Sequence, residues 1–145
     1  MLLYGEFNVF RPADANLILG KVWHALRPGG LLLLEPHPFE LVQQIGKMPA
    51  SWYSSAGGLF SAHPHVVMQE NFWDDDSHAA TTRYFILDAH TGQVSQYAQS
   101  FQAYHEDNYR SLLALHGFES VQILPGLLGG NSPKDLLAIT ARKQS

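Results

Sequence analysis

The spacing of apolar residues changes along the chain, and each spacing predicts a different element. After Pro12 the apolar residues recur every three or four positions, which predicts an amphipathic helix that ends at Pro28-Gly29-Gly30. The apolar stripe of this helix consists of Ala15, Ile18, Leu19, Val22, Trp23 and Leu26. Leu31 to Leu34 follows without polar alternation, so we expect a strand that is buried on both faces of a sheet.

Shorter apolar segments flank this helix and strand. Residues 1–7 predict a strand bounded by Gly5, and residues 38–45 predict a second helix. In residues 46–80, Gly, Pro, Ser, Asp and aromatic residues are mixed without a period. This mixture predicts an irregular insertion with a short helix near residues 51–60.

The second half of the chain begins with a hairpin and a helix. Residues 83–88 and 93–104 flank the turn Ala89-His90-Thr91-Gly92, in which glycine suits a left-handed position. The acidic residues of His105-Glu106-Asp107 favour the start of a helix, and Gly117 fits its end.

Two strands close the chain, near residues 121–123 and 136–141, with the Gly-rich segment 125–133 between them. The complete order predicts an α/β fold whose first part is built from parallel βαβ units. We expect the last two strands to form an antiparallel hairpin at one end of a mixed sheet. The chain is then a single domain, residues 1–145, in which residues 46–104 form an insertion with a β-hairpin.

Composition and charge exclude several classes of function. The net charge of -4 gives no basic surface for a nucleic-acid backbone. Without cysteine the chain has no disulfide, no Cys-zinc site and no thiol nucleophile. The apolar runs are too short to span a bilayer, and no signal peptide is visible, so we expect a cytoplasmic protein.

The motifs, taken in order, resemble the second half of a class I S-adenosylmethionine (SAM)-dependent methyltransferase. Tyr4-Gly5-Glu6-Phe7-Asn8 is similar to the end of the fourth strand of that family, and Leu26-Arg27-Pro28-Gly29-Gly30 to the turn before its fifth strand. Residues 104–109 with His116-Gly117-Phe118 are similar to its last helix and the exit from it. The resemblance implies a partial Rossmann-like fold, methyl transfer to a small molecule, and a hairpin around residues 88–92 that covers the substrate.

The elements that hold SAM in this family are absent from the sequence. The family uses a Gly-rich loop after its first strand and an acidic residue at the end of its second. The glycines at Gly57-Gly58 and in residues 126–130 do not follow a buried first strand and do not begin a helix. We therefore expect a truncated or split C-terminal half that binds no SAM and is inactive alone. The edge at residues 1–7 and an uncovered sheet face predict a homo-oligomer such as a homodimer, or a missing N-terminal half as partner.

Candidate site residues follow the two predicted strand ends, where open α/β sheets bind ligands. Glu35 and His37 are candidates for the general base. The resemblance places Tyr4, Gly5 and Glu6 toward the cofactor, and Asn8 toward the substrate. The structural alternatives are that Glu6 caps a helix or turn and that His37 is a surface residue.

Aromatic residues of the insertion are candidates for a small-molecule pocket, which would be lined by Trp52, Tyr53 and Trp73 and closed by Tyr104. The alternative is a satellite core beneath the insertion. His63, His65, His78 and Asp74-Asp75-Asp76 match no metal motif, so no metal is expected. A different class of function also remains open: a non-catalytic ligand-binding or oligomerisation module derived from the methyltransferase fold.

Overall fold

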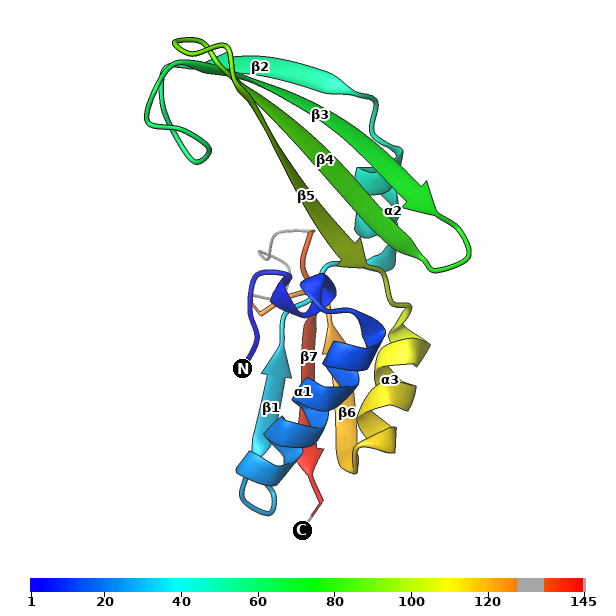
Figure 1. Cartoon of the computed structure of the whole chain (residues 1–145). Helices are drawn as coiled ribbons and strands as arrows, with labels where there is room; N and C mark the ends of the chain where they lie inside the picture. Colours follow the sequence, from blue (N-terminus) through cyan, green and yellow to red (C-terminus); the bar gives the residue numbers. More distant parts are fainter. Residues whose placement is uncertain (128–134, 145) are drawn as a thin grey trace. The chain divides into compact units, whose positions relative to one another are not determined.

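A computed structural model describes residues 1–127 and 135–144 of the chain. The chain divides into two compact units (Figure 1). The first consists of Met1–Val42 and Phe101–Ser145, and the second of Gln43–Ser100. No helix in the described part of the chain is long and apolar enough to cross a membrane.

The sheet of the first unit has three strands in the order β1-β7-β6. They are β1 (Leu31–Leu34), β6 (Phe118–Leu124) and β7 (Ala138–Lys143), and β7 pairs antiparallel with both neighbours. The predicted strand at 31–34 and the predicted C-terminal antiparallel hairpin at one end of the sheet are confirmed.

Two helices, α1 (Pro12–Ala25) and α3 (Glu106–Leu115), cover one face of this sheet (Figure 1). Pro12 starts α1 at a position where its missing N–H costs no hydrogen bond. Side chains from both helices meet the sheet in one apolar core, formed by Phe7, Ala15, Leu19, Leu32, Leu34, Tyr109, Leu113, Phe118, Ile139 and Ala141. The predicted helices in these two regions are confirmed.

Strand β1 is not buried on both faces, contrary to the sequence prediction. Leu32 and Leu34 are buried in the core, whereas Leu31 is 52% exposed. The cause is that α1 and α3 pack against the same face. Leu31 and Leu33 on the other face keep part of their apolar surface in contact with water.

Residues 1–7 are the second correction, because they do not form a continuous strand. Leu2 makes a single parallel bridge with Leu34, through hydrogen bonds from Leu2 N–H to Leu33 O (3.0 Å) and from Glu35 N–H to Leu2 O (2.8 Å). Tyr4 and Gly5 then take left-handed φ angles of 55° and 74°. The 3₁₀ helix η1 (Glu6–Val9) follows. The chain therefore turns away from the sheet after one parallel pair.

The second unit is built around an antiparallel sheet in the order β2-β3-β4-β5. Its strands are β2 (Ser51–Ser55), β3 (His65–Asp74), β4 (Ala79–Asp88) and β5 (Val94–Gln102). The hairpin predicted around residues 89–92 is confirmed. The irregular insertion predicted at 46–80, with a helix near 51–60, is wrong, because β2 and β3 extend the hairpin into a four-stranded sheet.

One face of this second sheet is covered and the other is open. Helix α2 (Phe39–Lys47) packs on the covered face through Gly46, where an added Cβ would lie 3.1 Å from that of Ala80. Phe60, from the segment between β2 and β3, packs there with its ring tilted against Tyr84 and stacked on Tyr97. Val67 and Ile86 are buried beneath these groups.

Both long hairpins are closed by an aspartate that accepts two backbone hydrogen bonds. Asp74 Oδ1 accepts from the N–H groups of Asp76 and Ser77, and Asp88 Oδ1 accepts from those of His90 and Thr91 (2.8–3.0 Å). These bonds favour the charged carboxylates and hold both pKa values below the ordinary 3.8, with the bonds from Ser77 and Thr91 as the largest causes.

Replacing the turn aspartate of β4 and β5 tests this role. We expect Asp88→Ala to lower the free energy of unfolding, because two turn N–H groups lose their acceptor. The contribution of Asp88 is present above pH 3.8 and is lost as the pH falls through the lower pKa of the folded state. Urea unfolding at pH 7 and carboxyl NMR titration measure both effects. The control Asp76→Ala removes an exposed carboxylate of the other hairpin, and an equal loss in both variants would contradict the assignment.

Candidate functional site

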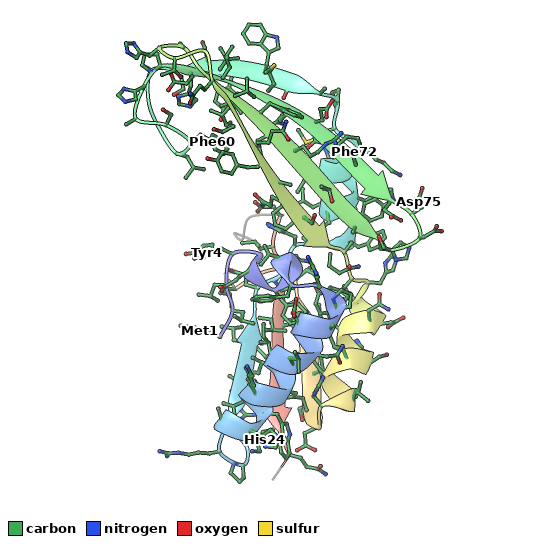
Figure 2. The ribbon with its side chains drawn as sticks, in the orientation of Figure 1. Met1, Tyr4, His24, Phe60, Phe72 and Asp75 are labelled. Carbon is green, nitrogen blue, oxygen red and sulfur yellow. The ribbon has the colours of Figure 1, made fainter. Side chains whose placement is uncertain are left out.

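The parallel bridge at Leu2 brings the two predicted strand ends together. Tyr4 N–H donates to Glu35 Oε2 (3.0 Å), and Gly5 N–H donates to the Glu35 carbonyl (2.8 Å). Glu35 is only 8% exposed, whereas the Tyr4 side chain is exposed and points away from the ribbon (Figure 2). One carboxylate oxygen of Glu35 is therefore engaged in holding the left-handed turn at Tyr4 and Gly5.

His37 lies two residues further on, with its ring fixed on several sides. Nδ1 is 2.7 Å from the carbonyl oxygen of Asp135, and the edge of the ring meets Phe101 with centroids 5.8 Å apart. A carbonyl oxygen only accepts hydrogen bonds, so Nδ1 must carry the hydrogen. In the neutral ring Nε2 then has the free lone pair, which makes Nε2 the atom that can accept a proton.

Gly5 is required beside this ring for two reasons. Its φ of 74° is left-handed, and a Cβ at this position would overlap Nε2 and Cδ2 of His37. The glycine thus allows the backbone turn and the close approach of the imidazole together.

Asn8 connects these groups to the rest of the first unit. Its Oδ1 accepts from His37 N–H (2.8 Å), and its Nδ2 donates to Gln102 O (2.8 Å) and Tyr109 Oη (3.3 Å). The side chain is fully buried, and both N–H groups are used. Asn8 therefore holds the strand ends together rather than offering a donor to a ligand.

An aromatic cluster lies beneath Asn8. Phe7, Tyr104 and Tyr109 pack with ring centroids 5.2–5.9 Å apart. Burial raises the pKa of both tyrosines, so their hydroxyls stay protonated. Among the described residues, the hydroxyl of Tyr104 is the buried side-chain polar atom without a hydrogen-bond partner.

Tyr104 also lines a cavity of about 130 Å³ at the start of α3. Its other walls include Phe39, His105 and Leu137, together with Glu40 and Glu106. The imidazole of His105 stacks on Phe39 at 3.7 Å between centroids.

The other predicted site residues are placed differently. Glu6 is exposed on η1. Trp52 and Tyr53 alternate on β2 and so point to opposite faces of the second sheet, with Trp52 72% exposed. Trp73, on β3, is half-buried, and its indole N–H donates to Asp75 Oδ1 (2.7 Å). Within the described ranges, no three His, Asp or Glu side chains gather as metal ligands.

Two groups that shape the site were missed by the sequence analysis. Asp135 contributes only its backbone carbonyl to His37, and Phe101 contributes a ring edge. A backbone carbonyl carries no residue-type signal. Phe101 falls within a predicted hairpin strand, and the pattern of the sequence indicates no contact with residue 37.

Solved structures share this fold. A SAM-dependent methyltransferase from Clostridium acetobutylicum matches with a TM-score of 0.67 at 11% identity, over 99% of this chain and 56% of that one. The CcbJ methyltransferase from Streptomyces caelestis gives 0.67 at 10% identity over 99% and 55%, and the sugar N-methyltransferase KedS8 from Streptoalloteichus sp. gives 0.66 at 16% over 99% and 54%. No protein-family model and no curated protein matches the sequence.

These matches confirm the predicted α/β class and the resemblance to part of a SAM-dependent methyltransferase. At such low identities they establish the Rossmann-like methyltransferase fold of the chain. The chain spans a little over half the length of the solved structures that it matches.

Substituting Gly5 tests the close approach of the imidazole. Gly92 is the matched control, because its φ of 72° is almost that of Gly5 but a Cβ there would meet nothing within 4 Å. We expect Gly92→Ala to cost about 1–2 kcal/mol of backbone strain, and Gly5→Ala to cost about 1–3 kcal/mol more through overlap with His37. Urea unfolding measures both, and equal losses would show that the ring does not constrain position 5.

The two buried tyrosines should respond differently to loss of the hydroxyl. Tyr109→Phe leaves an Asn8 N–H without its acceptor and should cost about 1 kcal/mol of unfolding free energy. Tyr104→Phe removes a hydroxyl without a partner and should stay within about 0.5 kcal/mol of the wild type or be stabilising. A larger loss for Tyr104→Phe than for Tyr109→Phe would contradict this assignment of hydrogen bonds.

Proposed function

We propose that this chain forms the acceptor-binding half of a SAM-dependent methyltransferase that acts on a small molecule. The observation that carries the proposal is the fold match, which extends over 99% of the chain in each of the three methyltransferases described above. The strand-end cluster supports it, because the groups capable of proton transfer lie at the edge where open α/β sheets bind ligands.

The described residues do not form a complete cradle for SAM. The N–H groups of Tyr4 and Gly5, the backbone donors at this edge, are both used by Glu35. The groups of this segment that remain available to a cofactor are the exposed Tyr4 ring and the Glu6 carboxylate. We therefore assign most of the SAM contacts to a polypeptide segment with a Gly-rich loop, which would cover the open sheet face at Leu31 and Leu33.

The proposed role of His37 is that of general base. In such an enzyme SAM supplies an electrophilic methyl group. His37 Nε2 accepts the proton that the acceptor's amine or hydroxyl loses, while Asp135 O holds Nδ1–H and fixes the direction of the lone pair. Glu35 orients the neighbouring turn, and Tyr104 forms part of a cavity wall nearby in the first unit. Alignment of acceptor and methyl group supplies the rest of the rate enhancement.

An open hollow in the second unit supports a different function, that of a binding module. Trp52, Met68, Glu70 and Phe85 line an open hollow of about 320 Å³ on the uncovered sheet face. An apolar hollow of this kind suits a binding module with no catalytic step. The two functions differ in whether His37 matters, since the hollow contains residues of the second unit only.

The test compares two histidine variants of this chain, each assayed together with a polypeptide that carries the proposed Gly-rich segment. With labelled SAM and a panel of small amines and hydroxyl compounds, His37→Gln should lower kcat roughly 10²–10⁴-fold with little change in KM for SAM. The exposed control His90→Gln should match the wild type. Wild-type kcat in His37→Gln would overturn the role of His37, and no methyl transfer by the wild type would favour the binding module.

Calorimetry on residues 1–145 alone tests the division of the cofactor site. We expect no heat of SAM binding at about 100 μM protein. Micromolar binding by this chain would contradict the assignment of the SAM contacts to another segment, while leaving methyl transfer itself in place.

A further inference from the structure

We propose that Glu35 is a positioning residue for His37, which it holds in place through the turn at Tyr4 and Gly5, and that it is not a second base. The proposal rests on the proposed function in one respect, since it takes His37 as the group that accepts the proton. It decides between the two residues that the sequence offers as candidates for the general base. All four residues belong to the first unit.

Glu35 is a buried acidic side chain that bonds to the backbone rather than to a cation. It is 8% exposed, and its Oε2 accepts from Tyr4 N–H at 3.0 Å. The ion pair among the described residues joins Arg83 to Glu70 in the second unit, so no described cation pairs with Glu35. Because a carboxylate is costly to bury, its presence here points to a role in the turn that it contacts.

The turn at Tyr4 and Gly5 needs an external hold. Both residues have left-handed φ angles, 55° and 74°, and this conformation is unfavourable for a tyrosine. Glu35 bonds to both of their N–H groups, through its carboxylate to Tyr4 and through its backbone carbonyl to Gly5 (2.8 Å). One residue therefore fixes two consecutive positions of the turn.

This turn lies against the ring of the candidate base. A Cβ at Gly5 would overlap Nε2 and Cδ2 of His37, so the backbone at Gly5 contacts that part of the imidazole. At the other side of the ring, Nδ1 is 2.7 Å from the carbonyl oxygen of Asp135. The ring is held between these two contacts. A shift of the turn would therefore change the direction of the Nε2 lone pair.

The same geometry separates the roles of the two residues. Oε2 of Glu35 is engaged by Tyr4 N–H, and the side chain is buried. His37 is only half-buried, and its Nε2 keeps a free lone pair in the neutral ring. The structure thus assigns proton transfer to His37 and the alignment of its ring to Glu35.

Two substitutions of Glu35 separate alignment from proton transfer. Each variant is assayed together with the polypeptide that carries the Gly-rich segment. Glu35→Ala should lower kcat roughly 10–100-fold with little change in KM for the acceptor, because the turn loses its hydrogen-bond acceptor and the imidazole is misaligned. Glu35→Gln should recover most of this loss, since an amide oxygen still accepts from Tyr4 N–H but is not a base. The exposed control Glu119→Ala should match the wild type.

Two outcomes of this assay would overturn the proposal. Wild-type kcat in Glu35→Ala would show that the turn does not align the ring. Equal losses in Glu35→Ala and Glu35→Gln would show that the carboxylate itself is needed. Urea unfolding checks that each variant is folded under the conditions of the assay.

NMR on residues 1–145 tests the link to the ring without methyl transfer. A nuclear Overhauser effect between Gly5 Hα and His37 Hδ2 should be present in the wild type and in Glu35→Gln, and lost in Glu35→Ala. An effect that persists in Glu35→Ala would contradict the proposal. If the effect changes as expected but the wild type transfers no methyl group, the proposed function fails while the alignment of His37 by Glu35 is supported.

Discussion

The buried amide of Asn8 is the interaction on which the geometry of the strand ends depends. It joins four segments that are distant in the sequence: the 3₁₀ helix η1, His37 after β1, Gln102 at the end of β5, and Tyr109 on α3. A fully buried amide is costly unless its polar atoms are paired, and here both donors and the acceptor are engaged. This arrangement fixes the backbone of His37, from which the ring extends to Gly5 and Asp135. The orientation of the candidate base thus follows from a side chain that need not touch a ligand.

Each of the two sheets has one covered face and one face with exposed apolar side chains. In the first unit the helices α1 and α3 cover one face, while on the opposite face Leu31 is half-exposed. In the second unit α2 and Phe60 cover one face, while Trp52, Met68 and Phe85 form a row across three strands on the other. Such exposed apolar rows mark interaction surfaces. Both units therefore present open faces beyond the contacts that stabilise them.

The fold of the first unit could be predicted where local periodicity and burial agree. The stripe from Ala15 to Leu26 and the run Leu31–Leu34 gave α1 and β1, and Gly117 correctly ended α3. Strand β3 was missed because His65–Asp74 mixes polar and apolar residues, and its alternation is broken by the half-exposed Glu70 and Asn71. Residues 1–7 were misjudged because an apolar segment does not reveal where the backbone turns left-handed. The role of Asn8 was also hidden, since a polar residue after a strand predicts a ligand contact and a structural bond equally well.

Burial of Tyr109 has a consequence for the range of pH in which the first unit stays folded. Desolvation raises the pKa of this phenol well above the ordinary 10.0, so its folded state retains the proton after an unfolded chain would release it. The stability that this burial provides is complete below pH 10.0 and declines as the pH rises above that value, because ionisation then favours the unfolded chain. The aromatic cluster that anchors Asn8 thus sets an alkaline limit on the integrity of the whole strand-end cluster.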